Sequence, residues 1–237
     1  MQENQPTVFL LDDEESVVTA LARLLHAEGF TTRSWTLVTE FLDAHDPECP
    51  GCLVTDLRMP EMSGLELQRT LIARGVDRPI VFITGQGDVP TTVQAMRAGA
   101  ITFLPKPVRG ADLVAAVREA LAKDAEMRAR RYEQEEVCRR LASLTPRERQ
   151  VLDLVTTGML NKQIAATLGA AEKTIKVHRG RVMEKMHVRS AVALVGLFAR
   201  TNLHNSVLSG GSVLSGGRVP ALPPRREWLL NSNAPLT

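Results

Sequence analysis

Short apolar runs alternate with amphipathic segments along the first half of the chain. Runs of about four to eight apolar residues that end in a polar residue or a turn are typical of strands buried on both faces of a parallel sheet. They predict strands over residues 7–12, 52–56, 79–85 and 102–107, and the short segment 31–35 is a further candidate strand. Between them, apolar residues recur about every three or four positions, which indicates helices. The predicted helices are residues 16–29, 37–45, 64–75, 89–100 and 110–131.

This strict alternation of strands and helices favours an α/β domain. Parallel strands joined by helices form right-handed crossovers, and the helices then cover both faces of the sheet. We therefore predict a five-stranded, doubly wound parallel sheet of the flavodoxin-like type over residues 5–122.

The second half of the chain has a helical pattern throughout. Residues 123–142 hold 6 basic and 5 acidic side chains, and we interpret them as a helical linker that extends the fifth helix. Ser143 or Thr145 can cap the next helix, and Glu148 completes a capping box with Thr145. The pattern predicts an all-α domain over residues 143–204. Its four helices are about residues 146–157, 161–168, 172–187 and 190–202.

The last segment, residues 205–237, differs from both predicted domains. It repeats the hexapeptide SVLSGG and is dense in proline. Such composition cannot bury enough apolar surface to offset the entropy of ordering, so we expect a disordered tail.

Charge divides the chain in the same place as the pattern. Residues 1–122 hold 10 basic and 17 acidic side chains, a balance of −7, whereas residues 143–204 hold 10 and 4, a balance of +6. An acidic front and a basic back indicate two domains with different partners, the basic one facing phosphates. Ordinary scatter of solvated charge is the alternative.

Neither the apolar runs nor the N-terminus indicates a membrane protein. No run approaches the roughly 20 apolar residues that span a bilayer. The N-terminal MQENQPTVFLLDDEES lacks the basic segment of a signal peptide. We expect a cytoplasmic protein with no membrane partner.

The cysteines offer one motif. Cys49 and Cys52 have the C-x-x-C spacing of redox and metal sites, but Cys138 is the only other cysteine and no histidine cluster accompanies them. The Pro-Gly between them is better interpreted as a turn that enters a strand.

Polar side chains follow the apolar strands where a doubly wound sheet binds its ligands, outside the carboxyl ends of the strands. If the first and third strands are neighbours, three carboxylates converge there, and Mg²⁺ prefers such hard oxygen ligands. A lysine and a hydroxyl beside a metal are the groups that bind a phosphoryl group, and a carboxylate can be the nucleophile that receives it. The central Asp56 is the best candidate nucleophile. The residues concerned are Asp12, Asp13, Asp56, Thr84 and Lys106.

Each of these residues also has a structural interpretation. Asp12 and Asp13 can cap the following helix. Thr84 before Gly85 can belong to a turn, and Lys106 can be a solvated charge. The functional interpretation is favoured because all five stand together at strand ends.

The basic domain contains a helix-turn-helix pattern. Two helices flank the turn at residues 169–171, and the second can enter a major groove. Its residues Ile175, Val182 and Met186 form a predicted buried stripe. The rest of the helix combines basic side chains with the apolar Val177 and with Gly180, which has no side chain. This combination suits contact with phosphates, guanine and a thymine methyl. A small helical bundle with a solvated basic face is the alternative. The candidate DNA-binding residues are Lys173, Thr174, Lys176, Val177, His178, Gly180, Arg181 and Lys185.

The first domain resembles the receiver domain of bacterial two-component response regulators through LLDDEE, LVTDLRMPEMSGLEL, FITGQGDV and TFLPKP. The resemblance implies that Asp56 accepts phosphate from a sensor histidine kinase. It implies a magnesium site formed by Asp13, Asp56 and the Arg58 carbonyl, with Asp12 acting through water. Thr84 and Lys106 would contact the phosphoryl group, and Phe103 would be an aromatic switch, although a strand phenylalanine is more often a core residue. The Lys106–Pro107 bond is expected to be cis, as in the family.

The second domain looks like the LuxR-type DNA-binding domain through LTPRERQVLDLV and NKQIAATLGAAEKTIKVHRGRVMEKM. Together the two resemblances indicate the FixJ/NarL family. They imply a phosphorylation-dependent transcriptional regulator, not an enzyme, that binds double-stranded DNA and forms a homodimer when phosphorylated. The face of the fourth helix and fifth strand that would dimerise or release the DNA-binding domain includes Val93, Met96 and Arg97.

Two other classes of protein use similar parts. A phosphatase or phosphotransferase with an aspartyl nucleophile needs a second general acid near Asp56, where the chain has Arg58 instead. A flavodoxin-like cofactor binder needs a phosphate-binding loop after the first strand, where the acidic DDEES would repel phosphate.

Overall fold

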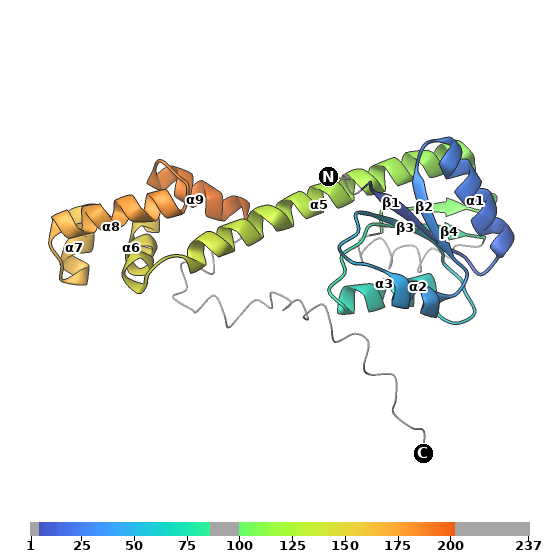
Figure 1. The fold of residues 1–237 in the computed structure, drawn as a ribbon, viewed down its shortest axis with the longest axis horizontal. Helices are drawn as coiled ribbons and strands as arrows, with labels where there is room; N and C mark the ends of the chain where they lie inside the picture. Colours follow the sequence, from blue (N-terminus) through green and yellow to red (C-terminus); the bar gives the residue numbers. More distant parts are fainter. Residues whose placement is uncertain (1–4, 86–99, 202–237) are drawn as a thin grey trace, which may run out of the picture. The chain divides into compact units, whose positions relative to one another are not determined.

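The computed structural model describes residues 5–85 and 100–201. The chain forms two compact units, residues 1–129 and 130–237, so they divide inside the predicted linker. The first unit contains a sheet of five parallel strands, and Figure 1 shows α1 and α5 on one of its faces and α2 and α3 on the other. The strands are β1 (Thr7–Leu11), β2 (Thr31–Trp35), β3 (Gly51–Asp56), β4 (Ile80–Thr84) and β5 (Thr102–Pro105).

The strand order is β2-β1-β3-β4-β5, so β1 and β3 are neighbours, as the convergence of the carboxylates requires. Leu11 of β1 lies opposite Thr55 of β3, and Asp56 lies opposite Ile83 of β4. This register brings the carboxyl ends of the three central strands to the same edge. The predicted doubly wound α/β fold is confirmed.

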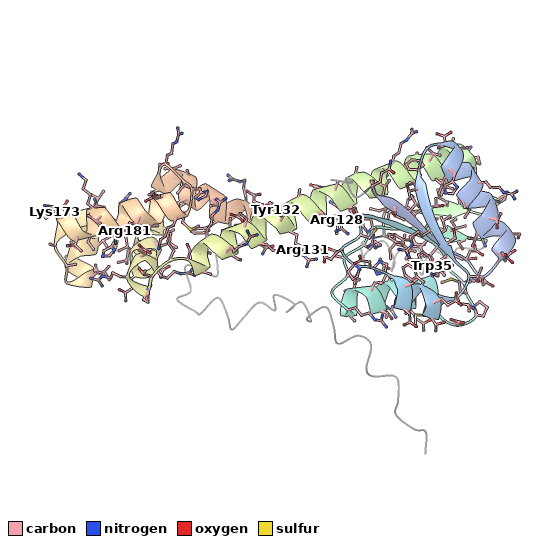
Figure 2. The ribbon with its side chains drawn as sticks, in the orientation of Figure 1. Trp35, Arg128, Arg131, Tyr132, Lys173 and Arg181 are labelled. Atoms are coloured by element: carbon pink, nitrogen blue, oxygen red, sulfur yellow. The ribbon has the colours of Figure 1, made fainter. Side chains whose placement is uncertain are left out.

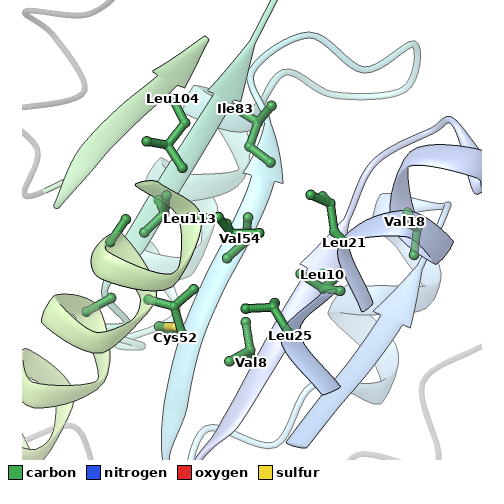
Figure 3. Packing of buried hydrophobic residues seen from close by; sticks show 14 residues of the cluster. Val8, Leu10, Val18, Leu21, Leu25, Cys52, Val54, Ile83, Leu104 and Leu113 are labelled. Carbon is green, nitrogen blue, oxygen red and sulfur yellow. The ribbon is translucent and has the colours of Figure 1, made fainter. Parts of the chain in front are cut away.

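The apolar runs fill two separate core layers, because successive side chains of a strand point to opposite faces. In β1, Val8 and Leu10 pack against α1 (Glu15–Ala27) and α5 (Gly110–Ala142), the layer drawn in Figure 3. Phe9 and Leu11 face the other layer, with α2 (Val38–Ala44) and α3 (Gly64–Ala73). Strands buried on both faces are therefore apolar throughout, which explains the runs in the sequence.

Local signals set the bounds of these helices. Ser63 and Glu66 form a capping box at the start of α3. Gly29, with φ +85°, takes the left-handed conformation just after α1, the role expected of a terminal glycine. The predicted helix at residues 89–100 lies outside the described residues.

The described part of the second unit, residues 130–201, is helical. Thr145 and Glu148 form the predicted capping box, while the Ser143 hydroxyl donates to the Arg140 carbonyl instead. The helix predicted over 172–187 ends at Lys185, because His187 has a left-handed φ of +54°. The helices are α6 (Pro146–Thr156), α7 (Asn161–Leu168), α8 (Glu172–Lys185) and α9 (Ala191–Arg200).

The long helix α5 takes part in both units. Residues 110–142 form one helix, which confirms that the charged linker extends the fifth helix. Val137 and Leu141, on its last turns, are buried in the core of the second unit with residues of α6 and α8. The predicted four-helix domain thus has a further helical segment in its core. Among the described helices, none combines the length and the apolar character that crossing a membrane demands.

Candidate functional site

The carboxyl edge of the sheet brings together the acidic residues predicted from the strand ends. Carboxylate oxygens of Asp12, Asp13 and Asp56 lie within 4.8 Å of one another. Asp12 follows β1 and is 1% exposed, Asp56 ends β3 and is 8% exposed, and Asp13 is exposed. The three carboxylates therefore form a cluster that is open to solvent on one side.

Lys106 neutralises part of this cluster. Its Nζ donates a hydrogen bond to Asp56 Oδ2 at 2.6 Å and lies 2.9 Å from Asp12 Oδ2. Glu14 adds a third, more exposed carboxylate at 3.6 Å. Burial lowers the pKa of Lys106, but hydrogen bonds and charges from Asp56 and Asp12 outweigh it, so the net pKa is raised. The ammonium is consequently charged at any physiological pH.

Asp12 acts in this cluster and does not cap α1. The helix begins after Glu14, which makes no side-chain cap hydrogen bond, and Asp12 Oδ1 accepts from the Glu14 amide at 3.0 Å. Burial is the largest influence on the Asp12 carboxyl and raises its pKa, against the lowering effect of Lys106. A second cation beside this carboxylate would offset that cost.

Asp56 is held in position by the loop that follows it. Its Oδ1 accepts a hydrogen bond from the Arg58 backbone amide at 3.0 Å, and the Arg58 side chain is exposed. Gly64, the first residue of α3, packs against the Asp56 carbonyl so closely that a Cβ would lie 2.6 Å from that oxygen. A side chain at Gly64 would therefore displace the strand end that carries Asp56.

Thr84 and Phe103 lie on the next two strands. Thr84 is 7% exposed, and its hydroxyl has no hydrogen-bond partner among the described residues. A buried hydroxyl at a strand end without a partner is available to a ligand oxygen. Phe103 is half-buried and stacks on Phe82, with ring centroids 5.1 Å apart. The Lys106–Pro107 bond is cis, as expected.

The donor set fits a divalent cation such as Mg²⁺. Three carboxylates face one lysine, so the cluster retains negative charge, and all its free donors are hard oxygens. The buried Asp12 Oδ2 has Lys106 as an ion-pair neighbour but no well-oriented hydrogen bond among the described residues. This edge of the sheet is therefore suited to a metal.

A second candidate site lies on α8. Gly169, with φ +60°, ends α7, and the turn at residues 169–171 leads into α8, as predicted. Ile175, Val182 and Met186 are fully buried, which confirms the predicted stripe. Figure 2 shows Lys173 and Arg181 projecting from this helix. Six of the candidate DNA-binding residues are exposed: Lys173, Thr174, Lys176, Val177, Gly180 and Arg181.

The remaining two candidates lie differently. Lys185 donates to Glu148 Oε2 at 2.7 Å and to the Ser143 carbonyl at 2.9 Å, so it joins α8 to α6. The hydrogen bond from Lys185 is the largest influence on Glu148 and lowers the pKa of that carboxyl to about 2. His178 is half-buried, and its Nδ1 has no hydrogen-bond partner in the described part of the chain.

Comparison with known proteins finds a family match in each unit. Residues 8–118 match the response regulator receiver domain, and residues 142–198 match the bacterial regulatory proteins of the luxR family. The transcriptional regulatory protein FixJ of Azorhizobium caulinodans is 44% identical, over 82% of this chain and 92% of its own length. The transcriptional regulatory protein TdiR of Thauera aromatica is 40% identical, over 86% and 89%.

The chain belongs to the FixJ/NarL family of two-component response regulators. Solved structures agree with this assignment. The response regulator StyR has a TM-score of 0.74 and 48% identity, over 83% of this chain and 99% of its own. Full-length FixJ from B. japonicum has a TM-score of 0.52 and 35% identity, over 84% and 98%. This response regulator regulates transcription in a phosphorylation-dependent manner.

The structure also reveals two contacts of this response regulator that the sequence reasoning missed. Glu14 lies near Lys106, and the only sequence signal was the third acid in LLDDEE. Arg179 donates to Asn161 Oδ1 at 3.1 Å and so joins α8 to the start of α7. This contact fixes the two helices of the helix-turn-helix pair, and no local sequence pattern predicts it.

Proposed function

We propose that Asp56 is the residue that accepts the phosphoryl group, from a sensor histidine kinase. The observation that carries this proposal is the hydrogen bond from Lys106 to Asp56 inside a carboxylate cluster at the sheet edge. A carboxylate oxygen attacks the phosphorus, the bond from phosphorus to the donor nitrogen breaks, and an acyl phosphate forms. The donor imidazole leaves with the electron pair of that bond and takes up a proton from solvent, which makes it neutral.

The surrounding residues have separate roles in this transfer. Asp12, Asp13 and Asp56, together with the Arg58 main-chain carbonyl, would hold Mg²⁺. When bound, this cation supplies positive charge that neutralises the phosphoryl oxygens. Lys106 supplies a second, fixed positive charge, and the Thr84 hydroxyl donates to a phosphoryl oxygen because it has no competing partner among the described residues.

The output of the receiver is a change in the switch residues and in assembly. Thr84 moves toward the phosphoryl group, and Phe103 follows into the space that Thr84 leaves. This change favours a homodimer. The predicted dimer face, with Val93, Met96 and Arg97, lies outside the described residues.

Binding to double-stranded DNA is the final step. Helix α8 enters the major groove, where Lys173, Lys176 and Arg181 contact phosphates or guanine and Val177 contacts a thymine methyl. Thr174, His178 and Gly180 complete this face of α8. Lys185, which pairs with Glu148, also belongs to it. Two linked DNA-binding units bind paired half-sites with avidity, so dimerisation increases promoter occupancy. We place the whole exchange in the cytoplasm, where the DNA lies.

Replacement of the acceptor tests the proposal. Asp56→Asn replaces the nucleophilic carboxylate with an amide of nearly the same volume. Labelling by a radioactive small-molecule phosphodonor is therefore expected to disappear. Asp77→Asn is a matched control, because Asp77 is an exposed acid of the same unit. Persistent labelling of the D56N variant refutes the assignment. Removal of Mg²⁺ by a chelator is expected to stop labelling of the wild type.

A further inference from the structure

The opposite edge of the receiver sheet contains a polar network that the phosphoryl chemistry does not use. Arg78 and Asp124 are buried there, 6% and 4% exposed, and Arg128 lies beside them. We refer to Arg78, Asp124, Arg128 and the turn at residues 46–51 as the α5 clamp. All of these residues belong to the first unit.

The two arginines converge on the carbonyls of one turn. Arg128 donates to the carbonyls of Pro47, Glu48 and Cys49 at 2.9–3.1 Å. From the other side, Arg78 donates to the carbonyls of Asp46, Cys49 and Gly51 at 3.0–3.2 Å. The planar guanidinium offers several donors in fixed directions, so each arginine holds several carbonyls at once.

Asp124 connects this turn to α5. Its Oδ2 accepts from the Gly51 amide at 2.8 Å and from Arg128 Nε at 2.9 Å. A buried carboxylate needs such partners to offset the cost of desolvation. Gly51 is confined as well, because a Cβ there would lie 1.8 Å from the Thr7 carbonyl oxygen. The bond between Gly51 and Asp124 therefore joins two parts of the chain that cannot shift independently.

The clamp lies where the apolar attachment of α5 to the receiver ends. The buried residues of α5 in the sheet core run from Leu113 to Ala120, with Leu121 packed against them. Beyond Leu121, Asp124 and Arg128 make hydrogen bonds from α5 to the start of β3 and the turn before it. Figure 2 shows Arg128 on α5 at this place, with Arg131 and Tyr132 following. Hydrogen bonds thus extend the attachment by two helical turns.

The same bonds join α5 to the strand that carries Asp56. Gly51 is the first residue of β3 and Asp56 is the last, and all six residues of this strand are buried. A packed strand held at both ends transmits a displacement along its length because the core is densely packed.

We propose that the α5 clamp makes Asp124 and Arg128 positioning residues, through which the state of Asp56 sets the position of the α5 turns that lead to the DNA-binding unit. This inference rests on the proposed role of Asp56. The clamp acts in addition to the switch formed by Thr84 and Phe103, and it lies at the opposite edge of the sheet.

Arg128→Gln tests the clamp, with Arg131→Gln as a matched control. Both variants remove one positive charge from α5. Arg131 lies three residues beyond Arg128, outside the clamp, where it is about half exposed and pairs with Glu135. In R128Q, amide exchange over residues 122–129 is expected to be at least about tenfold faster than in R131Q, because charged hydrogen bonds are lost. Lysine cannot hold three carbonyls in a fork, so R128K is expected not to restore slow exchange.

The decisive measurement compares DNA affinity with and without phosphorylation in the full chain. Allosteric coupling of this kind is typically about 5- to 150-fold. The R128Q variant is expected to take phosphate at the wild-type rate and yet to lose most of this gain, whereas R131Q retains it. Asp124→Asn, which keeps the side-chain volume, is expected to behave like R128Q. A full gain in both R128Q and D124N refutes the clamp and leaves the assignment of Asp56 intact.

A measurement on the wild-type chain does not depend on the stability of any variant. Amide exchange over residues 122–129 is compared before and after treatment with a phosphodonor and Mg²⁺. A change in exchange there, with phosphate on Asp56, supports the clamp. Unchanged exchange in a phosphorylated chain overturns it, and a chain that takes no phosphate overturns both the clamp and the proposed role of Asp56.

Discussion

The acidic site and α8 use charge in opposite ways. At the sheet edge, Lys106 lies against Asp56 and Asp12, and burial enforces their contact. On α8, Lys173, Lys176 and Arg181 are exposed and have no ion-pair partner within the described part of the chain. The first arrangement suits one small ligand. The second suits a polyanion.

The difference predicts how each region responds to substitution. A buried charge that loses its partner is costly, because desolvation is no longer offset. An exposed charge contributes little to stability and acts through affinity and its dependence on salt. Lys185 is on α8 but pairs with the buried Glu148, so it belongs with the first class.

The largest loss of stability is expected from Lys106→Met. When a chelator has removed Mg²⁺ and the ammonium is missing, Asp12 and Asp56 repel each other. We then expect the receiver to lose about 2–4 kcal/mol of unfolding free energy. Mg²⁺ should restore more stability in this variant than in the wild type, because the cation replaces the missing charge. Amide exchange in β1 and β3 measures both effects.

Lys123→Met is the control for this experiment. Lys123 makes an exposed ion pair with Glu126, so its loss should change stability by less than about 1 kcal/mol. Equal stabilisation of K106M and the wild type by Mg²⁺ would show that Lys106 does not balance the metal ligands.

Lys185→Met places the boundary between the two classes. Glu148 is 2% exposed, and without Lys185 its side chain accepts only the cap hydrogen bond of α6 among the residues that the structure describes. We expect the second unit to lose about 1–3 kcal/mol, a range reduced for the partial exposure of Lys185. Lys176→Met should instead leave stability within about 0.5 kcal/mol and lower the salt dependence of DNA binding by about one ion. Amide exchange of α6 and α8 and binding at several salt concentrations distinguish them.

Similar loss of stability in K185M and K176M would contradict this separation. The pair also has a signature in pH. The pKa of Glu148 is lowered to about 2 in the folded unit, below the ordinary 4.5. Its stabilisation is therefore complete above pH 4.5 and is lost as the pH falls toward 2. The K185M variant should lose less stability across this window than the wild type, because Lys185 no longer holds the pKa of Glu148 down.

The sequence predicted the acidic site well because a topological rule joins local signals. The central strands β1, β3 and β4 are apolar runs, and each ends in or is followed by a polar residue. Parallel strands gather those ends at one edge. Asp12, Asp56 and Lys106 could therefore be placed together before any coordinates were known. The buried stripe of α8 was predicted for a similar reason, since a helix repeats with a fixed period.

Contacts between distant polar residues had no such rule. Asp124 bonds to Gly51 across 73 positions, and Lys185 to Glu148 across 37. In the sequence, Asp124 is one more charge in a charged linker, and Lys185 is one more lysine on a basic helix. Only the packed fold distinguishes a buried partner from a solvated one, so the roles of both residues followed from the structure.

His45 extends the comparison to a smaller effect of buried charge. Burial first, and the nearby Arg78 charge second, lower the pKa of His45 from 6.5 to about 4. The unfolded chain thus binds more protons than the folded chain between pH 4 and 6.5, and stability rises with pH in that window. We expect His45→Gln to remove about 1–2 kcal/mol of this pH dependence, after allowance for partial exposure.

Urea unfolding of the wild type and H45Q at several pH values measures the difference. Glutamine can still accept the hydrogen bond that Arg78 Nε donates to His45 Nε2 at 2.7 Å. All other titrating groups are common to both chains, so they cancel. Identical slopes between pH 4 and 6.5 would show that His45 is not held neutral.

The smallest expected change is the replacement of glycine on α8. A Cβ at Gly180 would meet no atom within 4 Å, so Gly180→Ala should stabilise the second unit by about 0.5–1 kcal/mol through helix propensity. Gly196→Ala on α9 is the matched control, since its Cβ would lie 3.8 Å from an Arg200 side-chain nitrogen, an ordinary van der Waals distance. Both variants should gain similar stability, but only G180A should weaken DNA binding, because its methyl group would stand between α8 and the groove. Equal DNA affinity in the two variants would place Gly180 outside the interface and would leave this face of α8 an ordinary solvated surface.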